Sequence, residues 1–228
     1  MKSRSFELPA EVGNKLVRQG ADGVRWLNEL AGFVGQLEHD WNIAVGAVFS
    51  GGSEALVAQA TRADGSDAII KFGIPGPTGF EQEVRTLVAA DGRGYVRVLR
   101  HDAARRVMLQ ERLGPQLAQL HLPIRDQIEI ICATLQRAWV AVPDDLPLLT
   151  GSQKARRLAV FIEATWKSLG QPCSERAVEQ ALVFAQARQR AFDPAASVLV
   201  HGDAHNQNTL QIIGADRTDC SGFKFVDP

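Results

Sequence analysis

Apolar residues recur at two different periods along the chain, and the change of period divides it into elements. From residue 21 to residue 41 they return every three or four positions, which predicts one amphipathic helix. Short runs rich in strand-forming residues follow, and they predict strands over residues 43–49, 55–61 and 68–72. Gly51-Gly52 and Asp64-Gly65 separate these runs, so we expect an antiparallel meander.

The chain then passes from strands to helices. The next predicted elements are a helix over residues 78–90 and strands over residues 95–100 and 107–111. Beyond Gly114-Pro115 the predicted helices cover residues 124–140, 154–169 and 174–192. This order predicts an α+β fold with a sheet-rich N-terminal lobe over residues 1–113 and a mainly helical C-terminal lobe over residues 114–228.

A short apolar run at residues 198–200 leads into a polar loop that carries much of the candidate chemistry. We expect the run to be a buried strand, and the loop after it reads H-G-D-A-H-N-Q-N. A second strand near residues 209–213, a turn, and F-K-F-V-D-P follow. Two strands joined by a turn would return residue 227 to the polar loop.

Composition and charge exclude several classes of protein. The chain has 25 basic and 26 acidic residues, so it lacks the basic footprint of a nucleic-acid-binding protein. Its N-terminus has no apolar signal-peptide segment, and no run is long and apolar enough to cross a bilayer. The three cysteines form no C-x-x-C pair, which favours free thiols in a reducing compartment. We therefore expect a cytoplasmic protein, and the sequence does not indicate its oligomeric state.

Asp203 and Asn208 lie five positions apart, which is the D-x-x-x-x-N spacing of a kinase catalytic loop. In that chemistry the carboxylate orients the attacking hydroxyl and accepts its proton, while the amide holds Mg²⁺ on the nucleotide phosphates. Asp227 follows the last apolar run and would add a second oxygen ligand of the kind that Mg²⁺ prefers. Taken alone, each of these residues is also typical of an ordinary turn.

Lys71 lies inside A-I-I-K-F-G, a predicted strand that otherwise consists of buried residue types. A buried, unpaired ammonium is costly, so Lys71 needs an anion. Phosphate oxygens would supply one, and so would Glu83, which lies next to the apolar face of the following helix. Glu81 is expected to point to solvent. The alternative is an edge strand from which the Lys71 side chain extends into water.

The loop between the first two predicted strands contains Gly51, Gly52 and Ser53. Glycine lets the backbone approach phosphate groups closely and leaves N–H groups free to donate to them. Adjacent glycines are also common in hairpins, and the G-x-x-x-x-G-K-[ST] motif is absent. The loop therefore supports a nucleotide site only together with the residues above.

His201, Asp203 and His205 offer a competing interpretation as a metal site. Alternate positions of an extended segment share one face, and such a set can ligate zinc. The other histidines show no ligand spacing, and a catalytic zinc needs defined partners behind its ligands. We expect His201 to be structural, with its ring bonded to backbone around the loop, and His205 to anchor the loop or adjoin the active site. A metal-dependent hydrolase is the less favoured hypothesis.

With these residues considered, the sequence resembles the aminoglycoside phosphotransferase superfamily. Within it, the chain is most similar to the streptomycin 6-phosphotransferase branch, the aminoglycoside/hydroxyurea antibiotic resistance kinases. The loop resembles that family's H-G-D-x-H-x-x-N, and F-V-D-P resembles its I-D-P segment. Further blocks occur in the family's order, so the resemblance covers nearly the whole chain. They are R-W-L-N-E-L, F-S-G-G-S-E-A-L-V, A-D-G-S-D-A-I-I-K, E-V-R-T-L-V-A-A-D-G-R-G-Y-V-R-V-L and L-Q-E-R-L-G-P.

The resemblance implies a protein-kinase-like two-lobe fold in which ATP lies between the lobes. It implies transfer of the γ-phosphoryl group to a hydroxyl of an aminoglycoside-type antibiotic. The implied roles are a catalytic base at Asp203, Mg²⁺ ligands at Asn208 and Asp227, a phosphate-contacting lysine at Lys71 and its partner at Glu83. The implied hinge, which holds the adenine through backbone groups, includes Gln110, Glu111 and Leu113. Such a reaction needs mainly positioning and charge neutralisation.

The family continues past its Asp-Pro segment with further helices, whereas this sequence ends at Pro228. We therefore expect an incomplete C-terminal lobe and a deficient acceptor site. The leading hypothesis is a small-molecule kinase that uses ATP and Mg²⁺ and acts on a streptomycin-like aminoglycoside. The alternative is a nucleotide-binding remnant without transfer activity.

Overall fold

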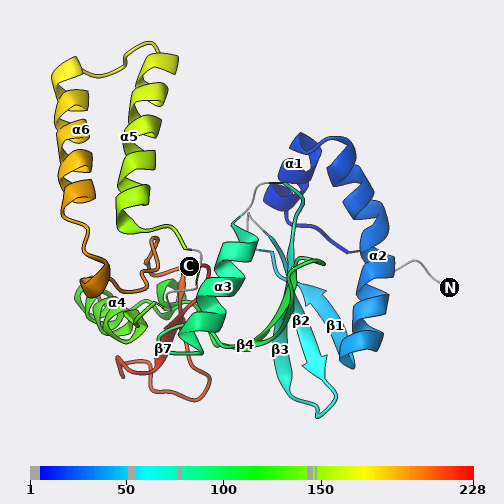
Figure 1. Ribbon diagram of the computed structural model, residues 1–228. Helices are drawn as coiled ribbons and strands as arrows, with labels where there is room; N and C mark the ends of the chain where they lie inside the picture. The colour runs from blue at the N-terminus through cyan, green and yellow to red at the C-terminus, as the bar shows by residue number, and fades with distance from the viewer. Residues whose placement is uncertain (1–5, 51–54, 77–78, 143–145, 147) are drawn as a thin grey trace. The chain divides into compact units, whose positions relative to one another are not determined.

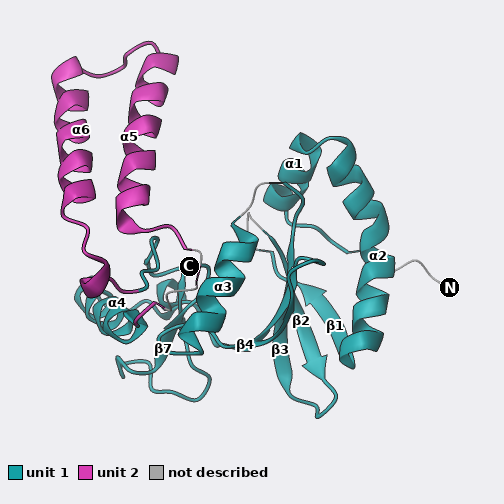
Figure 2. Ribbon diagram, viewed as in Figure 1, with its two compact units in different colours: residues 1–140, 199–228 teal, residues 141–198 magenta. Residues whose placement is uncertain are grey.

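The computed structural model describes residues 6–50, 55–76, 79–142, 146 and 148–228 (Figure 1). It divides into two compact units (Figure 2). Unit 1 comprises residues 1–140 and 199–228, and unit 2 comprises residues 141–198. The sequence predicted a boundary between two lobes at residue 113. This position lies inside unit 1, so the division into lobes stays a prediction.

A five-stranded antiparallel sheet has the strand order β1-β2-β3-β5-β4. Its strands are β1 (Ile43–Val48), β2 (Ala55–Arg62), β3 (Asp67–Gly73), β4 (Val98–Asp102) and β5 (Val107–Glu111). The first three form the expected meander, with Val57 opposite Lys71. On the other side of β3, Lys71 lies opposite Met108 of β5. β3 is therefore a central strand with neighbours on both sides.

The helices α1 (Ala10–Arg18) and α2 (Ala21–Trp41) precede the sheet. α2 has the predicted bounds, and its residues Leu30, Val34 and Leu37 pack against one face of the sheet. Full burial of one such side chain contributes about 1.5–3 kcal/mol to folding. The hydrophobic pattern did not predict α1. Its described residues include only two buried positions, Val12 and Leu16, and two positions do not define a period.

The helix α3 (Phe80–Ala90) contributes to the opposite face of the sheet. Side chains alternate along a strand, so Phe72 of β3 points toward α2 while Lys71 points to the other face, where Glu83 of α3 contacts it. Helical spacing predicted a start at Thr78, but residues 77 and 78 lie outside the described residues.

The remainder of unit 1 surrounds a two-stranded antiparallel sheet. Its elements are η1 (Leu117–Leu120), α4 (Ile124–Ala138), β6 (Thr209–Gln211) and β7 (Phe223–Phe225). Phe223 is buried against Leu117 and Ile130, which attaches the hairpin to α4. The predicted hairpin near residue 227 is therefore confirmed, although β6 ends two residues earlier than expected.

Part of the strand predicted over residues 95–100 belongs to this second sheet region. Tyr95 forms a parallel bridge with Phe225, and the Val96 N–H donates to Phe225 O at 2.8 Å. Regular pairing in the five-stranded sheet begins only at Val98. One apolar run thus supplies two different sheets, which a local pattern does not reveal.

The prediction of a buried strand over residues 198–200 is wrong. Val198 forms an isolated bridge with Ala141, and Val198 and Val200 are 40% and 56% exposed. Leu199 alone of the three is buried, and its N–H donates to Val140 O at 2.9 Å. A run of three apolar residues is too short to show a period, so its burial could not be inferred.

Unit 2 is a helical hairpin of α5 (Gly151–Ser168) and α6 (Glu175–Arg190), followed by η2 (Pro194–Ala196). Thr150 and Gln153 form a capping box at the start of α5, and the Ser174 side chain accepts from Ala177 N–H at the start of α6. Both predicted helices are confirmed. No helix in the described part of the chain has the length and apolarity needed to cross a membrane.

Candidate functional site

Lys71 lies between two carboxylates. Its Nζ is 2.6 Å from Glu83 Oε1 and 2.5 Å from Asp227 Oδ1. The central strand β3 supplies the lysine, α3 the glutamate and the segment after β7 the aspartate. Lys71 is 5% and Glu83 9% exposed. The predicted contact between Lys71 and Glu83 is present, and the alternative of a solvent-exposed edge-strand lysine is wrong.

The three charges determine one another's ionisation. Burial opposes the charge of Lys71, but attraction by Glu83 and then by Asp227 outweighs it and raises the Lys71 pKa above its usual value. Burial raises the pKa of Glu83 despite the attraction of Lys71. Asp227 is also penalised by burial, yet attraction by Lys71 lowers its pKa. Because the Asp227 side chain is 54% exposed, it is the carboxylate of the pair that a cation from solvent can reach.

The polar loop brings Asp203 and Asn208 to the segment that carries Asp227. The Val226 N–H donates to Asn208 O at 2.9 Å, and Asn208 Nδ2 donates to Asp203 O at 3.2 Å. The pairing of β6 with β7 sets up this proximity, as the sequence predicted. The Asp203 side chain is 79% exposed, so its carboxylate is accessible to a substrate.

The His201 ring joins the polar loop to the segment that carries Asp227. Its Nδ1 accepts from the Asp203 N–H at 3.2 Å, so Nε2 carries the proton and donates to Val226 O at 2.8 Å. Burial lowers the pKa of His201, which favours this neutral ring. The ring stacks on Tyr95 and meets Phe225 edge-on. The structural role predicted for His201 is confirmed.

The metal-cage interpretation is wrong. Within the described residues, no three His, Cys, Asp or Glu side chains form a group able to hold a metal ion. Both ring nitrogens of His201 already bond to the protein backbone. His205 Nδ1 accepts from the Gln207 N–H at 3.2 Å, which leaves Nε2, 3.6 Å from Asp203 Oδ2. His205 therefore anchors the loop beside Asp203.

Asp227 has a left-handed backbone conformation with φ of 57°. Side chains other than glycine seldom adopt this region, although aspartate tolerates it better than most. Such outliers occur often at functional sites, where the surrounding structure holds them in place. Here the hydrogen bond from Val226 and the contact with Lys71 hold Asp227 from both sides.

The expected hinge begins with the last two residues of β5, Gln110 and Glu111. Gln110 and Leu113 are buried, and the Glu111 carboxylate accepts from the Arg97 N–H at 2.7 Å and from Lys224 Nζ at 2.5 Å. The Glu111 side chain thus ties the first sheet to β7. The sequence analysis missed this ion pair, although F-K-F already placed Lys224 on the opposite side of its strand from two aromatic residues.

Gly51, Gly52 and Ser53 lie outside the described residues, so their role stays a prediction. The same holds for the individual roles assigned to the hinge and to the residues around Lys71. What the structure adds is that Lys71, Glu83, Asp203, Asn208 and Asp227 gather around one point of unit 1.

The arrangement of these residues agrees with a comparison with known families. A sequence profile described as "Aminoglycoside/hydroxyurea antibiotic resistance kinase" matches residues 40–228. The chain belongs to this family. A hydroxyurea phosphotransferase of Kitasatospora aureofaciens is 32% identical over 209 residues, which are 90% of this chain and 60% of that protein. A streptomycin 6-kinase of Streptomyces glaucescens is 24% identical over 213 residues, 91% of this chain and 67% of the kinase. The chain thus spans about 60% of the length of the hydroxyurea phosphotransferase.

Two solved structures resemble the chain in fold. A macrolide 2'-phosphotransferase type I has a TM-score of 0.53 and 16% identity, covering 88% of this chain and 74% of its own. A choline kinase from Cryptosporidium parvum has a TM-score of 0.51 and 12% identity, covering 87% and 63%. At these identities the likeness shows the fold, and the predicted kinase-like α+β fold is confirmed.

Proposed function

We propose that this family member binds ATP with Mg²⁺ and transfers the γ-phosphoryl group to a hydroxyl of a small antibiotic, a streptomycin-like aminoglycoside. The observation that carries the proposal is the contact of Lys71 with both Glu83 and Asp227, beside the loop of Asp203 and Asn208. These are the side chains that phosphoryl transfer requires: a cation for phosphate, oxygen ligands for a metal and a base for the acceptor.

The residues present suit a magnesium ion. Asn208 donates from its amide nitrogen to Asp203 O, so its amide oxygen is not used in that contact. Asp227 contacts Lys71 through Oδ1, and its side chain is 54% exposed. One ammonium against two carboxylates leaves a net negative charge at the site, which a divalent cation would offset. When bound, Mg²⁺ would neutralise charge on the nucleotide phosphates.

The chain's own groups would carry out the transfer. Asp203 orients the acceptor hydroxyl and takes its proton as the hydroxyl oxygen bonds to the γ-phosphorus. The bond from that phosphorus to the bridging oxygen breaks at the same time, and ADP leaves. Lys71, held by Glu83, contacts the phosphates. This step needs orientation and charge stabilisation more than any covalent intermediate.

Other groups would position the nucleotide. The backbone of residues 110–113 would hold the adenine, and Gly51, Gly52 and Ser53 would approach the phosphates. The lobes expected over residues 1–113 and 114–228 would enclose the nucleotide. The buried side chains of Gln110 and Leu113 support the hinge assignment because they fix the backbone of this segment.

The names of the relatives define the acceptors to test. Purified protein is incubated with Mg-ATP and streptomycin, other aminoglycosides or hydroxyurea, and phosphorylated product is detected by mass spectrometry. Asp203→Ala is expected to reduce transfer by about 10²–10⁴-fold, the usual contribution of a general base. Asp67→Ala, which removes an exposed aspartate at the start of β3, is the matched control.

The remnant hypothesis gives a different result in the same experiment. It predicts that Mg-nucleotide raises the melting temperature while no acceptor is phosphorylated. If product forms and Asp203→Ala makes it as fast as the parent protein, the assigned base is wrong. If neither stabilisation nor product is found, the nucleotide site itself is rejected.

A further inference from the structure

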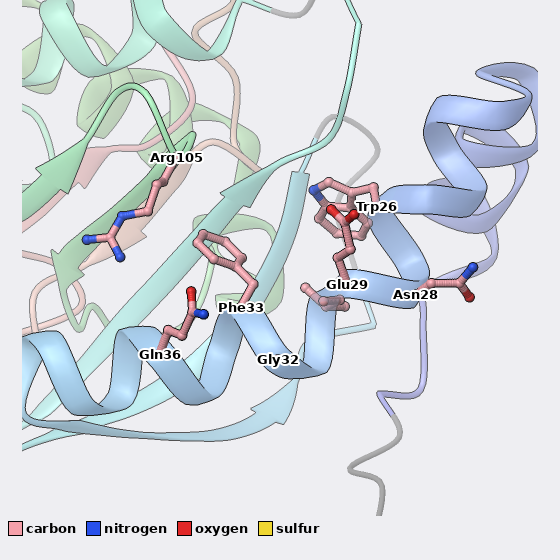
Figure 3. Close-up of a pocket in the computed structure, with 8 residues that line it drawn as sticks. Trp26, Asn28, Glu29, Gly32, Phe33, Gln36 and Arg105 are labelled. Carbon is pink, nitrogen blue, oxygen red and sulfur yellow. The ribbon is translucent and has the colours of Figure 1, made fainter.

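A cavity of about 520 Å³ lies along α2 (Figure 3). Its lining includes Trp26, Glu29, Phe33 and Gln36 of α2 together with Arg105 from the turn between β4 and β5. We call this cavity the α2 groove. Its volume falls within the range of small-molecule sites, about 300–1,000 Å³.

The α2 groove is on the other face of the sheet from the candidate site. The Phe33 ring meets the edge of Phe72 at 5.8 Å between centroids, with 72° between planes. Phe72 is buried in the core beneath α2, and its neighbour Lys71 points to the opposite face, toward Glu83. A ligand in the α2 groove would therefore not occupy the place proposed for the nucleotide.

One stripe of α2 supplies most of the groove. Trp26, Glu29, Phe33 and Gln36 follow one another at three or four positions, so they share a face of the helix. Figure 3 shows their side chains on the side of α2 toward Arg105. Trp26 and Phe33 also pack against the core cluster under α2, which holds the rings in place while leaving part of each exposed.

The groove is lined by one acidic and one basic side chain, Glu29 and Arg105. Arg105 donates to Asp102 Oδ2 and to Asp40 Oδ2, each at 2.7 Å, so its positive charge is matched by two carboxylates. Glu29 is exposed and has no ion-pair partner among the described residues. Arg100 also donates to Asp40 O at 3.3 Å, so Arg100 and Arg105 offset the charges of Asp40 and Asp102. The Glu29 carboxylate is the charge that an added cation would meet.

We propose that the α2 groove binds a small organic ammonium ion. Aromatic faces attract cations, tryptophan most strongly, and a carboxylate beside the ring adds an ion pair. Trp26 and Phe33 supply the faces, Glu29 supplies the carboxylate, and Gln36 supplies an amide that accepts from an N–H. Glu29 would repel an anion, and a neutral aromatic molecule would use the rings alone.

The probe is benzylammonium, and benzyl alcohol is the neutral control with the same ring. Binding to ¹⁵N-labelled protein is followed through the tryptophan indole N–H resonances, with Trp26→Phe identifying the Trp26 signal. We expect a saturable shift of that signal with benzylammonium and a binding constant at least about twofold weaker with benzyl alcohol. Raising the salt concentration weakens binding of the ammonium.

Three variants locate the charge that matters. Glu29→Gln is expected to weaken benzylammonium binding by about two- to fivefold, the range of an exposed cation–π or ion-pair contact. Gln36→Glu is expected to strengthen binding because it adds a carboxylate to the same stripe. Glu11→Gln, which removes an exposed carboxylate from α1, leaves binding unchanged.

Some results would overturn the proposal. The first is a Trp26 signal that does not shift with benzylammonium, and the second is equal binding of benzyl alcohol and benzylammonium. The third is parental affinity for benzylammonium in Glu29→Gln together with no gain in affinity in Gln36→Glu. The parent rate of phosphoryl transfer does not enter these measurements, so the test is independent of the proposed function.

Discussion

Lys71 and Asp227 are 156 positions apart in the chain, and Lys71 Nζ lies 2.5 Å from Asp227 Oδ1. This contact connects the central strand of the first sheet with the segment that follows β7. Glu83 binds the same ammonium, so the three residues act as one electrostatic unit. Removing Lys71 leaves two carboxylates without their cation, whereas removing either carboxylate leaves a neutral pair.

Lys71→Met is expected to affect both stability and transfer. The change leaves the buried Glu83 without a cation, which costs about 3–5 kcal/mol when one partner of a buried pair is lost. Loss of a charge-stabilising group from the site lowers the transfer rate by about 10²–10³-fold. Urea unfolding and steady-state kinetics measure the two effects.

Lys167→Met is the control for this change. Lys167 pairs with Glu163 at 3.6 Å on the exposed surface of α5. Exposed pairs of this kind contribute little to stability. Equal loss of stability in the two variants would mean that the contact at Lys71 is not a buried ion pair in solution.

The stability of the protein is expected to decrease on mild acidification because of His201. Its pKa is lowered in the folded state, mainly by burial, from an ordinary value of 6.5. Between these two pKa values the unfolded chain binds more protons, so the free energy of unfolding rises with pH in this window. Urea unfolding at pH 7.5 and at pH values below 6.5 shows the expected decrease on acidification.

A comparison of histidine variants assigns this pH dependence. His201→Gln lacks the titrating ring and should lose less stability on acidification than the parent. His39→Gln, at an exposed position of α2, should keep the parental dependence. A His201→Gln protein with the parental slope would assign the effect to other groups.

Tyr95→Phe is expected to leave stability unchanged or to raise it by up to about 1 kcal/mol. Tyr95 is fully buried, and its hydroxyl has no hydrogen-bond partner among the described residues. Burial raises the pKa of Tyr95 to about 12. Phenylalanine removes the unsatisfied oxygen and keeps the ring that stacks on His201. Thermal unfolding measures the change, and a clear loss of stability would reveal a partner for the hydroxyl.

Gly94→Ala is expected to destabilise unit 1 strongly. Gly94 has φ of 68°, and an added Cβ would lie 2.6 Å from the backbone nitrogen of Ala138 in α4. Strain and overlap together predict a loss of roughly 2–4 kcal/mol. Gly65 has φ of 80° with open space around it, so Gly65→Ala isolates the conformational cost of about 1 kcal/mol. Similar losses in both variants would show that α4 yields to the new methyl group.

Much of the first sheet and of the candidate site was predictable from local pattern. The meander followed from strand-like runs with turn residues between them, and β1 to β3 have that arrangement. Lys71 could be identified because a lysine in a buried strand needs an anion, and Glu83 because of its position on the next helix. The approach of Asp227 to Asn208 followed from two short strands around a turn.

Features that depend on distant contacts were not predictable. The division of the run that begins at Tyr95 depends on pairing with Phe225, far away in the chain. The role of Glu111 depends on Lys224 in the same way. In α1 and at residues 198–200 the apolar positions are too few to define a period. Local pattern thus identified residues that need a particular partner, such as a buried lysine that needs an anion. Long-range pairing determined which residues became those partners.

The hydrogen bond from Leu199 N–H to Val140 O joins the two points of unit 1 between which residues 141–198 are inserted. Because the ends of the insertion meet, its length and sequence can change while the backbone path on either side is kept. The α5–α6 hairpin can therefore be shortened, extended or replaced without rebuilding the part of the chain that holds Lys71 and its partners.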